Sequence, residues 1–205
     1  MNWLKFFIVF ILFTSVSQRL SAQETDFLMD ERDGNIYLVT KFGNLWWMCQ
    51  NLKYDAGEGS FCYDNDENNC MLQGRFYNFE AARSACPEGY RLPGDEDWMA
   101  LESYIGMNNS ELSQKYMRMS GKVGKYLKSG GGFGFNAELV GIINAGNVST
   151  KADQQVIFWT STKMNDGNVW VRSISSESDG INRTMVPVGY GLSVRCVKDV
   201  ATDEK

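Results

Sequence analysis

The 205-residue sequence contains no histidine. Imidazole is the usual base that activates a serine or cysteine nucleophile and is a frequent zinc ligand, so Ser-His-Asp triads and Cys-His pairs are excluded and a zinc site is disfavoured. A hydrolase that uses two carboxylates is compatible with 25 acidic residues, but no spacing singles out two of them. We therefore predict that the protein is not an enzyme and uses no cofactor.

Long apolar runs are also lacking. The longest run, FFIVFILF, follows Lys5 and falls short of the roughly 18 residues that a membrane-spanning helix needs. Its place between a basic residue and the small residues of LSAQ is typical of a secretory signal that is cut after Ala22. We predict a signal peptide over residues 1–22 and a mature protein without a membrane span that is periplasmic, at the cell surface or secreted. An uncleaved N-terminal anchor is the alternative.

Positive charge is scarce, with 20 Lys and Arg against 25 Asp and Glu. Cleavage of the signal would remove Lys5 and Arg19 but no acidic residue. Nucleic acid is disfavoured as a partner, because phosphate binding needs clustered Lys and Arg. The sequence also lacks a linker rich in Pro, Ser and Gly, heptads and repeats of fixed period, so the mature chain should form one domain.

Five cysteines are present, and in an exported chain this number is typical of two disulfides and one free thiol. Spacing alone leaves many pairings open. In YNFEAARSAC, apolar residues recur at helical intervals and place Cys86 on the buried stripe of a helix that ends at Pro87. In LSVRC, the alternation places Cys196 on the inward face of a strand. Both thiols should therefore face the core, which favours their pairing.

Cys62 and Cys70 would then form the second pair, and Cys49 would be free and buried as a small apolar residue. The loop between the second pair, YDNDENN, is rich in acidic and amide side chains.

Three of these side chains, Asp64, Asp66 and Asn68, fall at the first, third and fifth positions of a calcium-binding loop. The sixth and twelfth positions, Asn69 and Arg75, lack the glycine and glutamate that such a loop requires. A looser calcium site is one alternative. The other, which we favour, is a polar turn whose Asx side chains bond to their own backbone.

Turn residues and hydrophobic periods predict an α+β fold with antiparallel strands, two main helices and a long irregular loop region. Strands joined by turns at Asp33-Gly34 and Gly43-Asn44 should begin the chain. The first helix carries Cys86, and the second begins near Gly94. Later strands are expected over residues 139–143, 156–162, 169–175, 182–186 and 192–198. The terminal strands should lie close together.

A weaker helical stretch over residues 110–129 leads into the glycine-rich loop GGGFGF. Pro187 marks an edge strand or a strand end, because it cannot donate to a ladder. Asp95, Glu96 and Asp97 open the second helix, and we interpret them as complementing its dipole rather than as a catalytic cluster. The tryptophans in apolar strand-like runs are expected in the core: Trp46, Trp47 and Trp159.

A series of short motifs resembles, in order, the Fibrobacter succinogenes major paralogous domain: DGNIY, GNLWWM, CYDNDENNC, GRFYNFEAA, ACPEGYRLP, DEDW, FGF, FWTST and GLSVRCVKD. The resemblance covers residues 33–199, with a lead-in over 23–32 and a tail over 200–205. It implies a variant of the C-type-lectin-like fold, related to the formylglycine-generating-enzyme type. In that fold a helix cysteine pairs with one on the final strand, which here implies Cys86 and Cys196.

The resemblance also implies an exported or surface protein of a bacterium, but it supplies no catalytic residues. Cys49 departs from the family pattern, in which a small residue such as alanine is expected. The kinship to formylglycine generation suggests an enzyme only weakly, because that chemistry needs two reactive cysteines and the matching pair should form a disulfide.

We predict an exported binding or adhesion module of the bacterial envelope whose ligand is an extracellular glycan or protein. Lectin-like folds use their long irregular region and nearby strand ends, here about residues 130–155 and the hairpin MNDGNVW. Its Asn165, Asp166, Asn168 and Trp170 would offer polar groups beside an aromatic face, a mixture that suits sugars. The alternative for this hairpin is a turn at Asp166-Gly167 and a half-buried Trp. The alternative for the whole chain is a structural envelope-assembly protein that binds other proteins through a sheet edge.

Overall fold

The computed structural model describes residues 23–164 and 167–201. Over these residues the chain is a mixed α+β protein with mostly antiparallel strands, as predicted. The predicted signal peptide, residues 1–22, lies outside the described residues, as do residues 165–166 and 202–205. Within the described ranges, no helix combines the length and the apolar character that crossing a bilayer requires.

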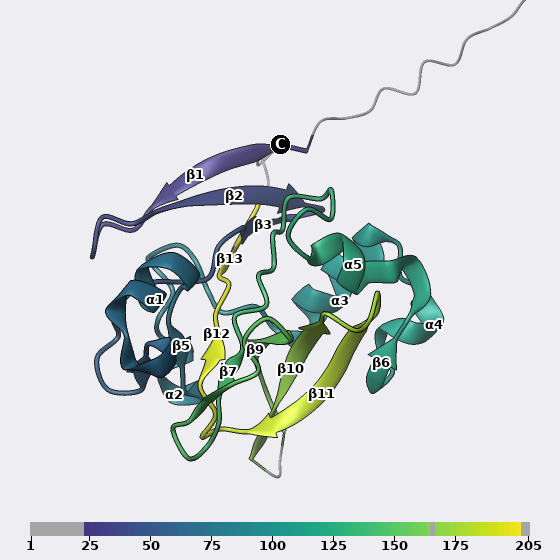
Figure 1. Cartoon of the computed structure of the whole chain (residues 1–205). Coiled ribbons are helices and arrows are strands. Elements are labelled where there is room, and N and C mark those ends of the chain that lie inside the picture. Colours follow the sequence, from purple (N-terminus) through teal and green to yellow (C-terminus); the bar gives the residue numbers. More distant parts are fainter. Residues whose placement is uncertain (1–22, 165–166, 202–205) are drawn as a thin grey trace, which may run out of the picture.

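One sheet contains the first three strands of the described residues and the last one, in the order β1-β2-β3-β13 (Figure 1). Its strands are β1 (Thr25–Met29), β2 (Ile36–Phe42), β3 (Leu45–Met48) and β13 (Val197–Asp199). The turns between the first three lie where the sequence predicts them. β13 pairs with β3 in antiparallel register, which confirms that the terminal strands lie close together.

The second sheet has the order β4-β5-β12-β9-β10-β11-β6. Its strands are β4 (Ser60–Phe61), β5 (Phe76–Tyr77), β6 (Tyr116–Arg118), β9 (Gln155–Lys163), β10 (Asn168–Ser175), β11 (Ile181–Pro187) and β12 (Leu192–Ser193). Pro187 ends β11, as predicted. β12 runs parallel to β9 at Ser193 and Phe158, and the other pairs are antiparallel. A separate small pair consists of β7 (Ile142–Ile143) and β8 (Ser149–Thr150).

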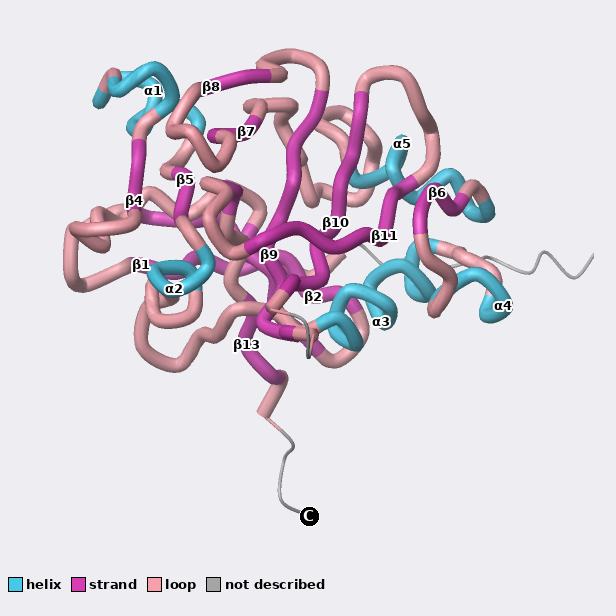
Figure 2. The backbone as a smooth tube through the Cα atoms, turned by 90° about the horizontal axis from the view of Figure 1, so that it is seen from below, coloured by secondary structure: helices cyan, strands magenta, loops and turns pink. Residues whose placement is uncertain are grey.

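The helices are short, apart from one. They are α1 (Glu67–Gln73), α2 (Phe79–Ala82), α3 (Asp95–Ile105), α4 (Asn109–Leu112) and α5 (Val123–Leu127), with 3-10 turns η1 (Tyr63–Asn65) and η2 (Ser120–Lys122). α3 begins directly after Gly94 and buries Trp98, Leu101 and Ile105, in agreement with the sequence. It packs against β9 and β10, and α1 and α4 lie at opposite ends of the molecule (Figure 2).

The first predicted helix is shorter than expected. α2 ends at Ala82, so Cys86 lies in the following loop and not on a helix. Pro87 has no N–H with which to continue the helical ladder, and the Ala85 carbonyl accepts a hydrogen bond from Arg32 (2.8 Å) instead of from the next turn. The chain thus leaves the helix before it reaches the cysteine.

The helical stretch predicted over residues 110–129 is also wrong. α4 and α5 occupy its two ends, and β6 lies between them, paired with β11. Arg118, in β6, turns into the interior and bonds to Glu102 of α3. A continuous helix could not satisfy both this contact and the pairing with β11.

The last predicted strand is interrupted between β12 and β13. Here the chain passes from the second sheet to the first, and its carbonyls accept hydrogen bonds from the end of β3 and from the segment after it. The Val194 carbonyl accepts from Leu52 N (2.9 Å), and the Cys196 carbonyl accepts from Met48 N (3.1 Å). The crossing segment, residues 194–196, therefore joins the two sheets. The strand predicted over residues 139–143 is reduced to β7.

Aromatic side chains fill the space between the sheets and α3. Trp47 and Trp98 lie 4.9 Å apart between ring centroids, and both contact Phe135. Trp47 and Trp159 are fully buried, as predicted, and Trp46 is half-buried.

Candidate functional site

The hairpin predicted to bind a ligand does not present an aromatic platform. Asn165 and Asp166 lie outside the described residues, and Asn168 is the first residue of β10. The Trp170 ring is only 6% exposed, and the Arg183 guanidinium lies 3.6 Å from its centroid. Since a sugar stacks on a free ring face, the position of Trp170 does not favour this role.

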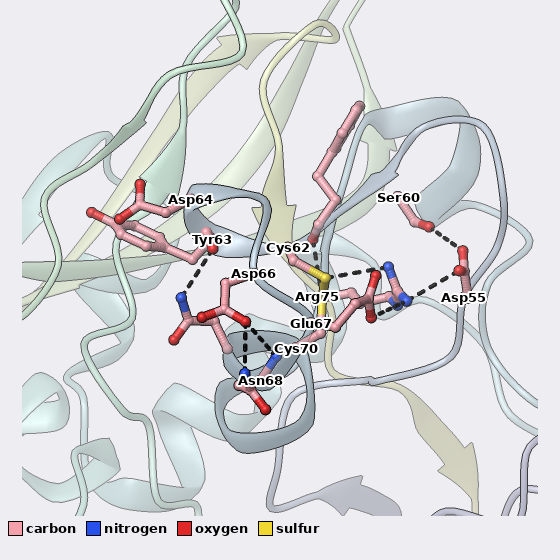
Figure 3. Close-up of a disulfide and its surroundings, with 12 residues drawn as sticks. Asp55, Ser60, Cys62, Tyr63, Asp64, Asp66, Glu67, Asn68, Cys70 and Arg75 are labelled. Carbon is pink, nitrogen blue, oxygen red and sulfur yellow. Dashed lines mark hydrogen bonds and ion pairs between the residues drawn. A yellow bond between two sulfur atoms is a disulfide. The ribbon is translucent and has the colours of Figure 1, made fainter.

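The acidic loop is closed by a disulfide between Cys62 and Cys70, with Cα atoms 5.1 Å apart (Figure 3). Asp66 caps α1, because its carboxylate accepts hydrogen bonds from the backbone N and the side-chain amide of Asn68, both at 2.9 Å. In Figure 3 the carboxylate of Asp64 lies apart from that of Asp66. The oxygens considered for calcium thus do not converge, and the geometry is that of the polar Asx turn.

One group of three potential metal ligands is found among the described residues, Cys62, Glu67 and Cys70. The two sulfurs are bonded to each other, so neither offers a thiolate. The Glu67 carboxylate is paired with Arg75 (2.8 Å), which also contacts Asp55 (3.0 Å; Figure 3). These ion pairs connect α1 to Arg75 and, through it, to Asp55. They do not form a metal site.

The second disulfide joins Cys86 to Cys196, with Cα atoms 5.8 Å apart. It links the loop after α2 to the crossing segment. Cys49 is the remaining cysteine, and it is free and buried. Both bridges are those that the sequence favours, although α2 ends before it reaches Cys86.

A cavity of about 270 Å³ opens where four segments meet. These are residues 49–53 after β3, Leu72 and Gln73 at the end of α1, the loop over residues 129–138 after α5, and Arg195 in the crossing segment. Most of the side chains around the cavity are polar or charged.

The segment after β3 bonds to the crossing segment on one side and to the end of α1 on the other. Besides the bonds to the crossing segment, the Leu52 carbonyl accepts from Arg75 N, and the Asn51 amide donates to the Gln73 carbonyl, both at 2.9 Å. Gly74 has a φ of 89°, and a Cβ there would lie 2.5 Å from Asn51 Cβ. The end of α1 therefore contacts this segment directly, and the bridge from Cys62 to Cys70 anchors the same helix.

Arg195 forms the floor of the cavity and is 1% exposed. Its Nε donates to Asn51 Oδ1 (2.9 Å), Nη1 donates to the Phe135 and Met48 carbonyls, and Nη2 donates to the Asn136 carbonyl (2.9 Å). All these acceptors are neutral. Burial lowers the pKa of Arg195 to about 10, opposed by the nearby Cys49 and Glu138, so the guanidinium is charged at neutral pH.

Cys49 lies beside this cation and is 1% exposed. Its sulfur is 3.1 Å from Thr40 Oγ1. Burial raises the pKa of the Cys49 thiol, against the opposing effects of the Thr40 hydrogen bond and the Arg195 charge. The thiol is therefore protonated at neutral pH and is a poor nucleophile.

A separate buried cluster of charges lies under α3. Asp95 binds Arg172 (2.7 Å) and Arg183 (2.6 Å), and Glu102 binds Arg172 and Arg118, both at 2.6 Å. Burial would raise the pKa of Asp95, but the hydrogen bonds and charges of the two arginines outweigh it and lower the pKa.

The dipole interpretation of the acids at the start of α3 is thus incomplete. It suits Asp97, which accepts from the Gly94 N–H (2.6 Å) at the helix end. It does not describe Asp95, which faces the interior.

Sequence reasoning missed both Arg195 and the buried charges. The available signal was an arginine inside each apolar, strand-like run, LSVRC and NVWVRSIS. Alternation assigns those arginines to an outward face, whereas the tertiary structure covers both faces.

The comparisons with known proteins agree with the motifs of the sequence. The model of the Fibrobacter succinogenes major domain family matches residues 40–198. No curated protein and no solved structure matches the chain. The family match spans both disulfides, the whole of the second sheet and every segment that lines the cavity, whereas β1 precedes it. The chain therefore belongs to the Fibrobacter succinogenes major domain family.

Proposed function

We propose that the chain is an exported binding module of the bacterial envelope that holds part of a glycan or protein ligand in the cavity above Arg195. The observation that carries the proposal is the convergence of hydrogen-bonding groups from four distant segments on one cavity of about 270 Å³. Binding sites are typically concave and contain a few fixed polar groups that orient the ligand. Two disulfides, which suit an oxidising compartment, support an exported location.

We further propose that the fold is a C-type-lectin-like variant. The pairing of the last strand with β3 and the disulfide from Cys86 to Cys196 support this assignment. Lectin-like folds use their long irregular region for recognition. In this chain that region supplies Asn136 and Glu138 to the cavity.

The proposed role is recognition without catalysis. The sequence has no histidine, and four of its five cysteines form disulfides. The fifth, Cys49, is buried and its thiol has a raised pKa. The charges under α3 pair with one another in the interior, which is the arrangement of a structural network.

Glycan-array binding by two matched variants tests the position of the site. Asn136 has a φ of 55°, so Asn136→Gly removes the amide side chain while glycine tolerates the backbone conformation. We expect Asn136→Gly to lose glycan binding with an unchanged thermal midpoint. We expect Asn168→Ala, in the hairpin, to retain glycan binding. Loss in Asn168→Ala alone, also at an unchanged midpoint, would move the site to the hairpin.

A second candidate function is that of an envelope-assembly protein. It is favoured by exposed apolar side chains at the β1 edge of the first sheet. Phe27, Met29 and Ile36 are 71%, 58% and 65% exposed on β1 and β2, and Met29 pairs with Ile36. An extended segment of an envelope protein could add to the edge of β1 that pairs with no strand in residues 23–164 and 167–201, with its apolar side chains beside these residues. The absence of any ligand on broad arrays, with an envelope protein that co-purifies with the wild type but not with Phe27→Asp, would favour this role.

A further inference from the structure

The buried arginines differ in how their charge is compensated. Arg118, Arg172 and Arg183 each form a salt bridge with a buried carboxylate of α3. Arg195 is as deeply buried, yet none of the described carboxylates forms a salt bridge with it. A buried charge without an ionic partner is costly, so an arginine at such a position calls for a reason.

One N–H of Arg195 is also left over. A guanidinium has five N–H donors. Nε uses its hydrogen on Asn51, Nη1 uses two on carbonyls, and Nη2 uses one on the Asn136 carbonyl. The second Nη2 hydrogen has no acceptor among residues 23–164 and 167–201, and Arg195 lines the cavity. The cavity floor therefore offers a fixed cation with a free donor.

We propose that the cavity binds the carboxylate of an acidic sugar, a hexuronate or a related sugar acid, against Arg195. This inference rests on the proposed binding function and specifies its ligand. A ligand with one negative charge matches the single cation, Arg195, at the cavity floor. A dianion such as phosphate fits less well, because the nearby Glu138 carboxylate would repel its second charge.

The remainder of the lining fits one sugar ring better than a peptide. Asn51, Gln73, Ser129 and Asn136 provide amide and hydroxyl groups of the kind that bind sugar hydroxyls. Leu72 is 75% exposed at the same cavity and provides an apolar surface for the C–H face of a ring. The volume is slightly below the roughly 300–1,000 Å³ of pockets for drug-sized ligands, so one monosaccharide unit is the expected occupant.

Calorimetric titration of the wild-type protein tests the charge requirement directly. The probes are D-glucuronate, D-galacturonate, the neutral primary amide of each acid, and short peptides with a free C-terminal carboxylate. We expect at least one sugar acid to bind about tenfold or more tightly than its amide, because the amide replaces an ion pair with the guanidinium by a hydrogen bond to a neutral carbonyl. Equal affinity of acid and amide, or tighter binding of the peptides, would overturn the proposal.

Glu138 gives a test of opposite sign. Glu138→Gln removes the competing carboxylate and should strengthen sugar-acid binding several-fold. Glu96→Gln makes the same change in net charge at an exposed position outside the cavity and should leave the affinity unaltered. Weaker binding in Glu138→Gln would contradict the proposed ligand orientation.

The failure of this inference can be told from the failure of the binding function. If neutral glycans bind and Asn136→Gly abolishes that binding, but acids have no advantage over amides, only the carboxylate assignment is wrong. If no glycan, no sugar acid and no peptide binds, both are wrong.

Discussion

At the residue scale, the acid at the start of α3 shows how a buried charge is stabilised in this protein. Asp95 binds two arginines on neighbouring strands, β10 and β11. The three partners contact one another inside the protein, so removal of the carboxylate would leave two buried cations with fewer acceptors. The loss of one member of a buried ion cluster typically costs about 3–5 kcal/mol.

Asp95→Asn should therefore lower the free energy of unfolding by about 3–5 kcal/mol at pH 7. The pKa of Asp95 is lowered below 3.8 in the folded state, so the ionised carboxylate stabilises the fold above that value. The stabilisation is lost as the pH falls through the folded-state pKa. Urea unfolding at pH 7 and at about pH 3 measures this effect. The difference in the free energy of unfolding between variant and wild type should be smaller at the lower pH. Glu96→Gln, in the same helical turn, is the control and should have little effect; an equal gap at both pH values would refute the argument.

Cys49 should resist alkylation in the folded protein. Its thiol is 1% exposed and its pKa is raised by burial, so little thiolate is available to react. Mass spectrometry after iodoacetamide treatment at pH 8 should show no adduct without denaturant and one adduct per chain in urea. Rapid modification of the folded protein, or more than one adduct in urea under non-reducing conditions, would contradict the cysteine assignment.

At the element scale, prediction succeeded where one local signal determines the structure. α3 has a glycine N-cap, acids in its first turn and buried residues at helical spacing, and all of these are visible in the sequence. The stretch over residues 110–129 fails because its structure is decided by distant partners. Tyr116, which pairs with Arg183 of β11, and Lys122, which precedes α5, have positive φ angles of 69° and 48° that a continuous helix does not contain.

We expect the position of α1 to depend on the disulfide between Cys62 and Cys70. The helix has seven residues, and Cys70 is its only buried member. The double variant Cys62→Ser, Cys70→Ser removes a nine-residue closed loop, for which the chain-entropy estimate is roughly 2.6 kcal/mol.

We expect this variant to remain folded, since both sheets lie outside the closed loop, but to lose ligand binding because Leu72 and Gln73 are no longer held at the cavity. Scanning calorimetry and the glycan array measure the two effects. Unchanged binding would show that α1 does not form part of the site.

At the scale of the whole molecule, the bridge between Cys86 and Cys196 has the larger effect. It spans 110 residues and is attached to the segment that joins the two sheets. The double variant Cys86→Ser, Cys196→Ser should lose about 4–5 kcal/mol, more than the loss of the smaller loop. Denaturant titration of both double variants gives the comparison. A smaller loss here than in the variant of Cys62 and Cys70 would contradict the entropic argument.

The candidate site could be predicted only in part. The sequence identified the cysteines and placed recognition in the long irregular region, which does supply Asn136 and Glu138 to the cavity. It could not identify Arg195 as the floor, because its bonding partners are as many as 147 residues away and no local pattern brings them together. Long-range packing creates the cavity, so periodicity and motif spacing contain no direct signal for it.

The pairing of β13 with β3 also bears on how the protein is made. The first sheet is complete only when β13 pairs with β3. Cys86 likewise needs Cys196, which directly precedes β13, to form its disulfide. A nascent chain that does not yet include residues 196–199 has neither partner. The first sheet and the bridge between Cys86 and Cys196 can therefore be completed only after residues 196–199 have been synthesised.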